Sequence, residues 1–410
     1  MSTSNQDRSQ PKSNFQGRTL TPWLLLTGII FIAATMRAPL TSVGPLIGLI
    51  RETMHISNTL AGLITTLPLF AFAIFSPFVP ALGRKYGIEQ VMFASIILLT
   101  TGIVIRSLSG AIGLFAGTAI LGLAIAVSNV LLPGLIKREF PHKLGMMTGI
   151  YSISMNLCGA IASGISVPMA VGLGMGWSGA LAVWGIMSLI AVLLWLPQVK
   201  RRENRTSATV HAARDKVNLW RSPLAWQVTF FMGLQSTLFY VTAAWLPDIL
   251  AEQGISADQS GWLLSILQLA LLPLTFIVPI IAGRMSSQRP LVVLSFLFVV
   301  SAILGLLYGS AGAIVIWIIL LGIGIGFAFG LALMFFGLRT RNAQEAAELS
   351  GMAQSCGYLL AGTGPVLFGF LHDVTHSWST PLYVLLGAAI LLLIFGLGAS
   401  RNRYVGENPN

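Results

Sequence analysis

Long apolar stretches constrain this chain more than any other feature of its sequence. They run to about twenty residues or more without alternation, which is the length that an α-helix needs to cross a bilayer. Membrane-spanning β-strands would instead alternate in runs of about ten residues. Only 9% of the residues are charged, whereas soluble domains carry about 25%. The sequence therefore predicts an all-α integral membrane protein, because only helices and closed barrels satisfy the backbone in lipid.

Twelve membrane-spanning helices are predicted from the apolar windows. The long polar stretch at residues 198–222 separates two sets of six, and it is interpreted as a linker between residues 1–197 and residues 223–410. The helices are expected at residues 22–50, 59–82, 89–107, 111–136, 145–171 and 177–197, and at residues 223–250, 259–283, 290–309, 312–337, 348–371 and 380–400.

The two halves resemble each other weakly, as a duplicated unit would. Short matches recur at shifts of 200 to 202 residues and pair each helix with the sixth helix after it. Parallel halves related about the membrane normal, with a site between them near mid-depth, are a transporter architecture. The matches are Leu82-Gly83-Arg84 with Ala282-Gly283-Arg284, Leu121-Gly122 with Leu321-Gly322, Thr148-Gly149 with Ser350-Gly351, and Pro45 with Pro247.

Basic residues crowd one side of the predicted membrane layout. If each helix switches sides, one side collects 21 of the 24 Lys and Arg residues. Such an excess marks the cytoplasmic side, so both termini are expected inside the cell. The net charge of +11 thus indicates membrane topology rather than nucleic-acid binding. The residues on that side are Arg8, Lys12, Arg18, Arg84, Lys85, Lys137, Arg138, Lys143, Lys200, Arg201, Arg202, Arg205, Arg214, Lys216, Arg221, Arg284, Arg289, Arg339, Arg341, Arg401 and Arg403.

Arg37 is the one basic residue that this layout places away from every helix end. It falls at the midpoint of the first predicted helix, where an arginine costs about 2.5–3.5 kcal/mol on insertion scales. We expect it to face a wet cavity and to offer its guanidinium to an anion or to a nitro or carbonyl group. The alternative is a structural arginine bonded to carbonyls that Pro39 and Pro45 leave free.

Neutral polar residues within the apolar stretches are candidates for the rest of the site. A buried amide or hydroxyl needs a partner, which is either a solute or another helix. Phe239 is a candidate for stacking on a flat heterocycle. The polar candidates are Asn129, Tyr151, Asn156, Gln235, Tyr240, Gln268, Gln354 and Tyr358.

Enzymatic and cofactor chemistry finds little support in the sequence. All 13 Asp and Glu residues lie at helix ends or in loops, which disfavours a mid-depth carboxylate relay. His372 and His376 have a metal-compatible spacing, but a solvated loop is the preferred interpretation. Gly322, Gly326 and Gly330 share one helix face, which favours close helix packing over a nucleotide loop. We expect no enzyme activity, no cofactor and no metal, and Cys158 and Cys356 are interpreted as packing residues.

Five stretches lie in order along nearly the whole chain: Met36-Arg37-Ala38-Pro39-Leu40-Thr41-Ser42-Val43-Gly44-Pro45-Leu46, Asn129-Val130-Leu131-Leu132-Pro133-Gly134-Leu135-Ile136-Lys137-Arg138, Trp220-Arg221-Ser222-Pro223-Leu224-Ala225-Trp226-Gln227, Trp245-Leu246-Pro247 and Leu349-Ser350-Gly351-Met352-Ala353-Gln354-Ser355. Together they resemble the cyanate and 2-nitroimidazole transporter family of the major facilitator superfamily. The 2-nitroimidazole branch looks nearer than the cyanate branch. A Gly-Arg-Lys turn at Gly83-Arg84-Lys85-Tyr86-Gly87 adds to the likeness, although the Asp that usually precedes its Arg is missing.

This resemblance implies a monomeric secondary transporter of a bacterial inner membrane that works by alternating access. Its implied cargo is a small planar solute, either a 2-nitroimidazole-like heterocycle or a cyanate-like anion, with export favoured. Alternatives are an importer or exchanger of another small anion, a channel, or a membrane sensor that binds solute without transport. The gating residues implied by the turn and its weaker copy are Gly83, Arg84, Lys85, Gly283 and Arg284.

Overall fold

The computed structural model describes residues 22–56, 58–108, 110–200 and 218–407, and every regular element in these ranges is a helix. The predicted linker at 198–222 falls mostly on residues 201–217, which lie outside the described residues, as do Arg8, Lys12 and Arg18. The first half contains α1 (Pro22–Thr41), α2 (Ile47–Met54), α3 (Asn58–Phe75), α4 (Val79–Tyr86), α5 (Ile88–Leu108), α6 (Gly110–Glu139), α7 (Leu144–Val167), α8 (Gly176–Ala182) and α9 (Trp184–Lys200). The second half contains α10 (Pro223–Glu252), α11 (Ala257–Ala282), α12 (Arg289–Tyr308), α13 (Ile314–Leu338), α14 (Ala343–Thr375) and α15 (Ser379–Ala399).

These helices form twelve spans in two halves of six, which confirms the predicted fold. Within the described residues, nine helical segments and the bent pair α3–α4 are long and apolar enough to cross a bilayer. The other two spans are α10 and α14, whose buried faces carry Gln235, Ser236, Ser350 and Gln354. These polar residues lower the mean hydropathy of α10 and α14, and the two helices tolerate them because they pack inside the bundle.

Three of the predicted continuous helices are interrupted in the structure, so the sequence prediction was wrong there. The predicted helix 177–197 is divided only at Val183, between α8 and α9. The first span ends as α1 at Thr41 and resumes through a 3-10 turn at Gly44–Leu46 into α2. Pro45 lacks the N–H that would bond to the Thr41 carbonyl, and this interrupts the helical ladder. The second span bends by 60° between α3 and α4, where Pro77 and Pro80 follow each other closely.

The internal repeat is visible in how glycines pack. In α6, a Cβ added at Gly122 would lie 3.0 Å from both Pro68 and Ala71 of α3. In α13, the equivalent Gly322 packs against Leu267 and Ala270 of α11, at positions one residue from equivalence under the 200-residue shift. Gly326 and Gly330 continue this contact along α11, which confirms that they form a packing face.

A reciprocal pair of contacts joins the two halves. A Cβ at Gly149 of α7 would lie 2.7 Å from the carbonyl oxygen of Phe276 in α11. A Cβ at Gly351 of α14 would lie 2.9 Å from the carbonyl oxygen of Ser76, which lies between α3 and α4. Shifts of 202 and 200 residues relate the two contacts. The halves therefore face each other about a pseudo-two-fold axis, as the repeat predicts.

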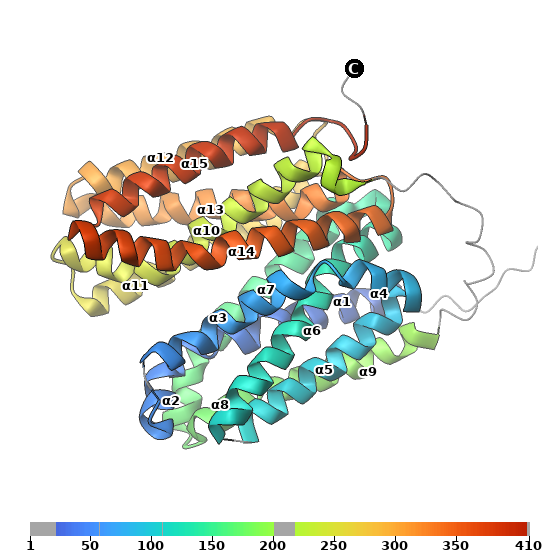
Figure 1. Cartoon of the computed structure of the whole chain (residues 1–410), viewed down its shortest axis with the longest axis horizontal. Coiled ribbons are helices and arrows are strands. Elements are labelled where there is room, and N and C mark those ends of the chain that lie inside the picture. Colours follow the sequence, from blue (N-terminus) through green and yellow to red (C-terminus); the bar gives the residue numbers. More distant parts are fainter. Residues whose placement is uncertain (1–21, 57, 109, 201–217, 408–410) are drawn as a thin grey trace, which may run out of the picture.

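The halves meet closely at one end of the bundle, where the spans of the first half lead into residues 84–88, 137–144 and 200; we call it the linker end and the opposite end the far end. Lys137 donates a 2.6 Å hydrogen bond to the carbonyl of Gly337 and another to that of Thr340, both in the second half. Gly134 lets α6 approach α14, since a Cβ there would lie 2.5 Å from the Ala343 carbonyl oxygen. In Figure 1 the halves diverge from this end towards α2 and α11.

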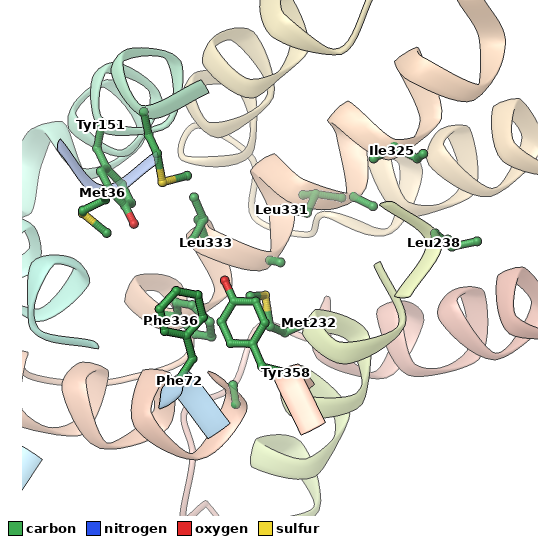
Figure 2. Packing of buried hydrophobic residues seen from close by; sticks show 14 of the residues in the cluster. Met36, Phe72, Tyr151, Met232, Leu238, Ile325, Leu331, Leu333, Phe336 and Tyr358 are labelled. Atoms are coloured by element: carbon green, nitrogen blue, oxygen red, sulfur yellow. The ribbon is translucent and has the colours of Figure 1, made fainter. Parts of the chain in front are cut away.

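Between the linker end and mid-depth, apolar and aromatic side chains fill the space between the halves. Phe72 of α3 and Tyr358 of α14 lie with their ring centroids 5.1 Å apart. Figure 2 shows this pair beside Phe336 of α13, and it shows Tyr151 of α7 next to Met36 of α1. All five side chains are buried. This packed layer closes the space between the halves on the side of the linker end. Any cavity between them must therefore lie nearer the far end.

Candidate functional site

A cavity of about 500 Å³ lies between the two halves. Its wall is built from α1, α3, α5, α6 and α7 of the first half and from α10 and α11 of the second. On these helices the lining residues belong mostly to the part nearer the far end, such as Thr41, Ser163 and Ala243. The volume falls within the range of small-molecule sites, and the position between two halves suits a solute site reached from one end.

Arg37 reaches this cavity because its neighbours on α7 are small. A Cβ at Gly159 would lie 2.6 Å from the Arg37 Cγ, so only glycine leaves room for the side chain to pass. Thr41, one helical turn later, donates a 2.7 Å hydrogen bond to the Gly159 carbonyl. The sequence Arg37-Ala38-Pro39-Leu40-Thr41 and Gly159 together hold α1 against α7 and direct the guanidinium towards the space between the halves.

The Arg37 guanidinium lies over an aromatic ring and has no acceptor among the described residues. Its Cζ is 5.1 Å from the ring centroid of Phe239 in α10, a cation–π distance. No hydrogen bond or ion pair of this side chain occurs in the described part of the chain. The structural alternative, in which backbone carbonyls freed by proline hold Arg37, has no contact to support it. A guanidinium fork is thus available at a cavity large enough for a small molecule, the geometry suited to binding a planar anion or nitro group.

Six of the nine predicted site residues line this cavity or a smaller one beside it. Asn156, Tyr240 and Gln268 line the large cavity with Arg37. Gln235 and Tyr358 line a small adjoining cavity of about 20 Å³ that also contacts Arg37, Asn156 and Tyr240. Within this group Asn156 already donates to the Ser152 carbonyl at 2.9 Å, and the Gln235 amide nitrogen donates to Ser236 Oγ at 2.7 Å.

The remaining three predicted residues line neither of the two cavities. Asn129 and Gln354 join the halves, and Tyr151 contacts Asn129 within the first half. The Asn129 carbonyl would normally bond to the N–H of residue 133, but that residue is Pro133. Gln354 of α14 donates to this free carbonyl at 2.8 Å, and Ser350 donates to it at 3.3 Å. Tyr151 donates to the Asn129 side chain at 3.5 Å.

A second carbonyl freed by proline is satisfied from the same helix. Pro77 cannot donate to the carbonyl of Ala73, and Ser355 of α14 donates to that oxygen at 2.6 Å. Ser350, Gln354 and Ser355 thus cap two gaps in the hydrogen-bond ladders of the first half. Because no water satisfies a carbonyl inside a bilayer, these bonds tie α14 to α3 and α6 in this conformation.

The predicted gating residues gather at the linker end. Arg84 forms an ion pair with Glu348 of α14, which joins the two halves. Gly283 packs against Gly145 of α7, with 3.1 Å between a Cβ at Gly283 and the Gly145 Cα. Gly83 lies against Leu131 in its own half, while Lys85 lies over the Tyr86 ring at 5.0 Å. Arg284 is exposed at this end. Glu348 in the opposite half thus pairs with Arg84, whose usual Asp is missing from the turn.

Arg106 is the functional candidate that the sequence interpretation missed. The sequence places it at the end of the third predicted helix, 89–107, and it does lie near the end of α5. Its burial in the cavity wall was not predicted. Arg106 is 0% exposed, lies in the wall of the large cavity and donates a 2.7 Å hydrogen bond to the Pro39 carbonyl. One signal was present: residues 88–108 and 110–139 are both helical, so almost no loop exists to take the charge.

The linker end holds a second buried arginine. Arg339 follows α13, and it donates to the Ala399 carbonyl at 2.7 Å and to the Gln288 side chain. Burial lowers the pKa of Arg339 to about 10, so its guanidinium stays charged at neutral pH. These bonds hold together the linker-side ends of α12, α13 and α15, which indicates a structural role for this residue.

The family model described as Major Facilitator Superfamily matches residues 24–365. Among curated proteins, the 2-nitroimidazole transporter of Escherichia coli (strain K12) is 43% identical over 382 residues, 93% of this chain and 96% of that protein. The cyanate transport protein CynX of the same organism is 26% identical over 376 residues, 90% of this chain and 97% of that protein. Among solved structures, the superfamily transporter FucP in its outward conformation aligns with a TM-score of 0.72 at 12% identity, covering 93% of this chain and 99% of that one.

Proposed function

The chain belongs to the major facilitator superfamily, and from this premise we propose that it carries a small planar solute across a bacterial inner membrane by alternating access. The proposed cargo is a 2-nitroimidazole-like heterocycle or a cyanate-like anion, with export favoured. Its relatives support this choice, since one is named a 2-nitroimidazole transporter and another a cyanate transport protein. Import or exchange of another small anion, or solute sensing without transport, are the alternatives that the test below separates.

The observation that carries this proposal is the position of Arg37. Its guanidinium lies beside a cavity of about 500 Å³ between the halves and has no acceptor among the described residues. A charge held at this depth in a membrane protein usually marks a solute or ion pathway. Asn156, Tyr240 and Gln268 add neutral donors and acceptors around it. In this proposal Arg37 binds the solute and the three neutral residues orient it.

The closed linker end supports an alternating-access cycle. Basic residues gather there, so the positive-inside rule favours a cytoplasmic linker end, and the cavity would then open to the outside. In the cycle, Asn129, Tyr151 and Gln354 would act at the interface between the halves, below the solute. Gln235 and Tyr358 would line the inner end of the solute site. Arg84 and Gly283, with their neighbours Gly83, Lys85 and Arg284, would open and close the inner gate.

Counterflow in proteoliposomes tests the proposal. Purified protein is reconstituted with unlabelled 2-nitroimidazole or cyanate inside, and entry of the labelled solute is measured. We expect counterflow in the wild type and a loss of at least about tenfold in Arg37→Gln, because a charged hydrogen bond contributes about 1.5–3 kcal/mol. Arg401→Gln, at an exposed arginine of the linker end, is the matched control and should transport normally.

Two results would contradict the proposal. If the folded wild type binds solute without counterflow, the chain is a sensor rather than a carrier. If Arg37→Gln transports at the wild-type rate, Arg37 is not part of the site. Direction is read from intact cells with and without the protein: an exporter lowers the accumulated solute, and an importer raises it.

A further inference from the structure

Arg106 is fully buried at the cavity and its backbone is held in place by close helix packing. It lies two residues before the end of α5 and contributes to the wall that also contains Arg37. Gly117 of α6 packs directly on the Arg106 backbone, where no larger residue would fit. Gly102, one turn earlier, packs against the backbone of α6 in the same way. The tight α5–α6 contact therefore fixes where the Arg106 side chain starts.

Most of the hydrogen-bonding capacity of Arg106 is unused. A guanidinium offers five N–H groups, and one nitrogen, Nη1, donates to the Pro39 carbonyl at 2.7 Å. The Nε and Nη2 atoms are buried and have no partner among the described residues. No ion pair of Arg106 occurs there either. A buried charge with unpaired donors is unfavourable unless something negative satisfies it, and the described protein supplies no such group.

The cavity carries two positive charges and no negative one. Arg37 and Arg106 both line it, and no Asp or Glu belongs to its wall within the described ranges. The other polar lining groups are neutral, and much of the remaining wall is apolar, including Leu40, Leu264 and Leu267. Low polarity around the two guanidinium groups strengthens their attraction for an anion. The apolar wall favours an anion that also has an apolar body.

We propose that Arg37 and Arg106 together form an anion site, and that the solute is an organic monoanion with a planar delocalised charge, such as a carboxylate, on a flat apolar body. This rests on the proposed transport function and selects, among its alternatives, another small organic anion as the solute. Arg37 presents its fork to the anionic group. Arg106 adds a second positive charge in the wall, and its unpaired Nε and Nη2, which are buried, reach the anion after a shift of the side chain. Arg106 also donates to the carbonyl of Pro39, two residues after Arg37 in the last turn of α1, so both arginines contact the same part of the first span.

Binding of a matched pair of probes tests this inference. Benzoate and benzamide have nearly the same shape, but only benzoate is an anion at neutral pH. Calorimetric titration of the detergent-purified protein should show benzoate binding and no detectable benzamide binding. Arg106→Gln should raise the Kd for benzoate by about ten- to a hundredfold, since a hydrogen bond to a charged group is lost. Arg106→Lys keeps the charge and should be intermediate, and Arg401→Gln should bind as the wild type does.

Three outcomes would overturn the anion site. Equal affinity for benzoate and benzamide would show that binding does not require a negative charge. The absence of benzoate binding to the folded wild type would show that the anion site does not exist. Wild-type affinity for benzoate in a folded Arg106→Gln would remove Arg106. If Arg106→Gln does not fold, Arg106→Lys decides: a raised Kd with benzoate still preferred supports the site, and an unchanged Kd contradicts it.

The proposed transport function fails separately from this inference. Counterflow of neutral solutes such as benzamide, but not of benzoate, would leave transport intact and refute the anion site. Anion binding with the predicted effect of Arg106→Gln, but without counterflow of any solute, would refute transport and leave the anion site intact. The two claims therefore have different decisive measurements.

Discussion

Replacing Gly149 by alanine should push the two halves apart at the linker end. In the closed arrangement the new Cβ would lie 2.7 Å from the Phe276 carbonyl oxygen and 3.1 Å from the Phe276 ring. Carbon and carbonyl oxygen in contact usually stay about 3.3–3.6 Å apart, so α7 and α11 must separate. Both sides of the contact are helices rather than flexible side-chain ends, and the strain is therefore not easily relieved within one half.

The expected size of the effect follows from the cost of overpacking. Inserting a methyl group into a packed interface costs about 1–3 kcal/mol. Because only the closed linker end contains the contact, the ratio of closed to open molecules should fall by about five- to 150-fold. Gly351→Ala meets the Ser76 carbonyl at 2.9 Å in the reciprocal contact, and it should shift the ratio in the same direction.

Distances between two spin labels measure this ratio. Labels attached to cysteines at His142 and Ser286, both exposed at the linker end in opposite halves, report the separation once Cys158 and Cys356 are replaced by alanine. Gly164→Ala is the control, because it lies on the same helix and its Cβ would meet nothing within 4 Å. Both substitutions raise helix propensity equally. If Gly149→Ala and Gly164→Ala give the same distance distribution, the contact does not restrain the closed state and the reasoning is refuted.

Three further predictions concern the polar contacts between and within the halves. Gln354→Leu removes the 2.8 Å bond to the Asn129 carbonyl and should lower the closed population by up to about tenfold in the same spin-label assay. An unchanged population would show that the bond from Ser350 alone satisfies this carbonyl. Arg84→Gln and Glu348→Gln should each change that population by less than about fivefold, since exposed ion pairs contribute about 0–1 kcal/mol; a larger shift would make this pair the main latch. Arg339→Leu should lower the melting temperature of the detergent-purified protein, because it leaves Gln288 and the Ala399 carbonyl without their donor. Breaking a buried charged network costs about 3–5 kcal/mol. An unchanged melting temperature would contradict the structural role of Arg339.

The sequence alone was sufficient to predict the twelve spans and the two halves, and to single out Arg37, which the structure places at the cavity. Each of these depends on local properties: the length of an apolar run, the density of Lys and Arg at its ends, and one charge far from either end. Hydrocarbon acts on each helix separately, so such features can be interpreted one span at a time. The glycine face of α13 was predictable for the same reason.

Only the tertiary structure decided which prolines break a helix and which arginine is buried. Pro45 and Pro77 interrupt their spans, while Pro133 in α6 and Pro365 in α14 leave theirs continuous. A proline inside a helix frees a carbonyl, and α14 supplies a donor both to Asn129, where α6 stays continuous, and to Ala73, where the second span bends. The donor stabilises either outcome, so the packing of the helices selects between them. Arg106 likewise points inward because the Pro39 carbonyl accepts its bond. A donor and acceptor 67 residues apart in the chain have no local signature, and only the packing of the helices brings them together.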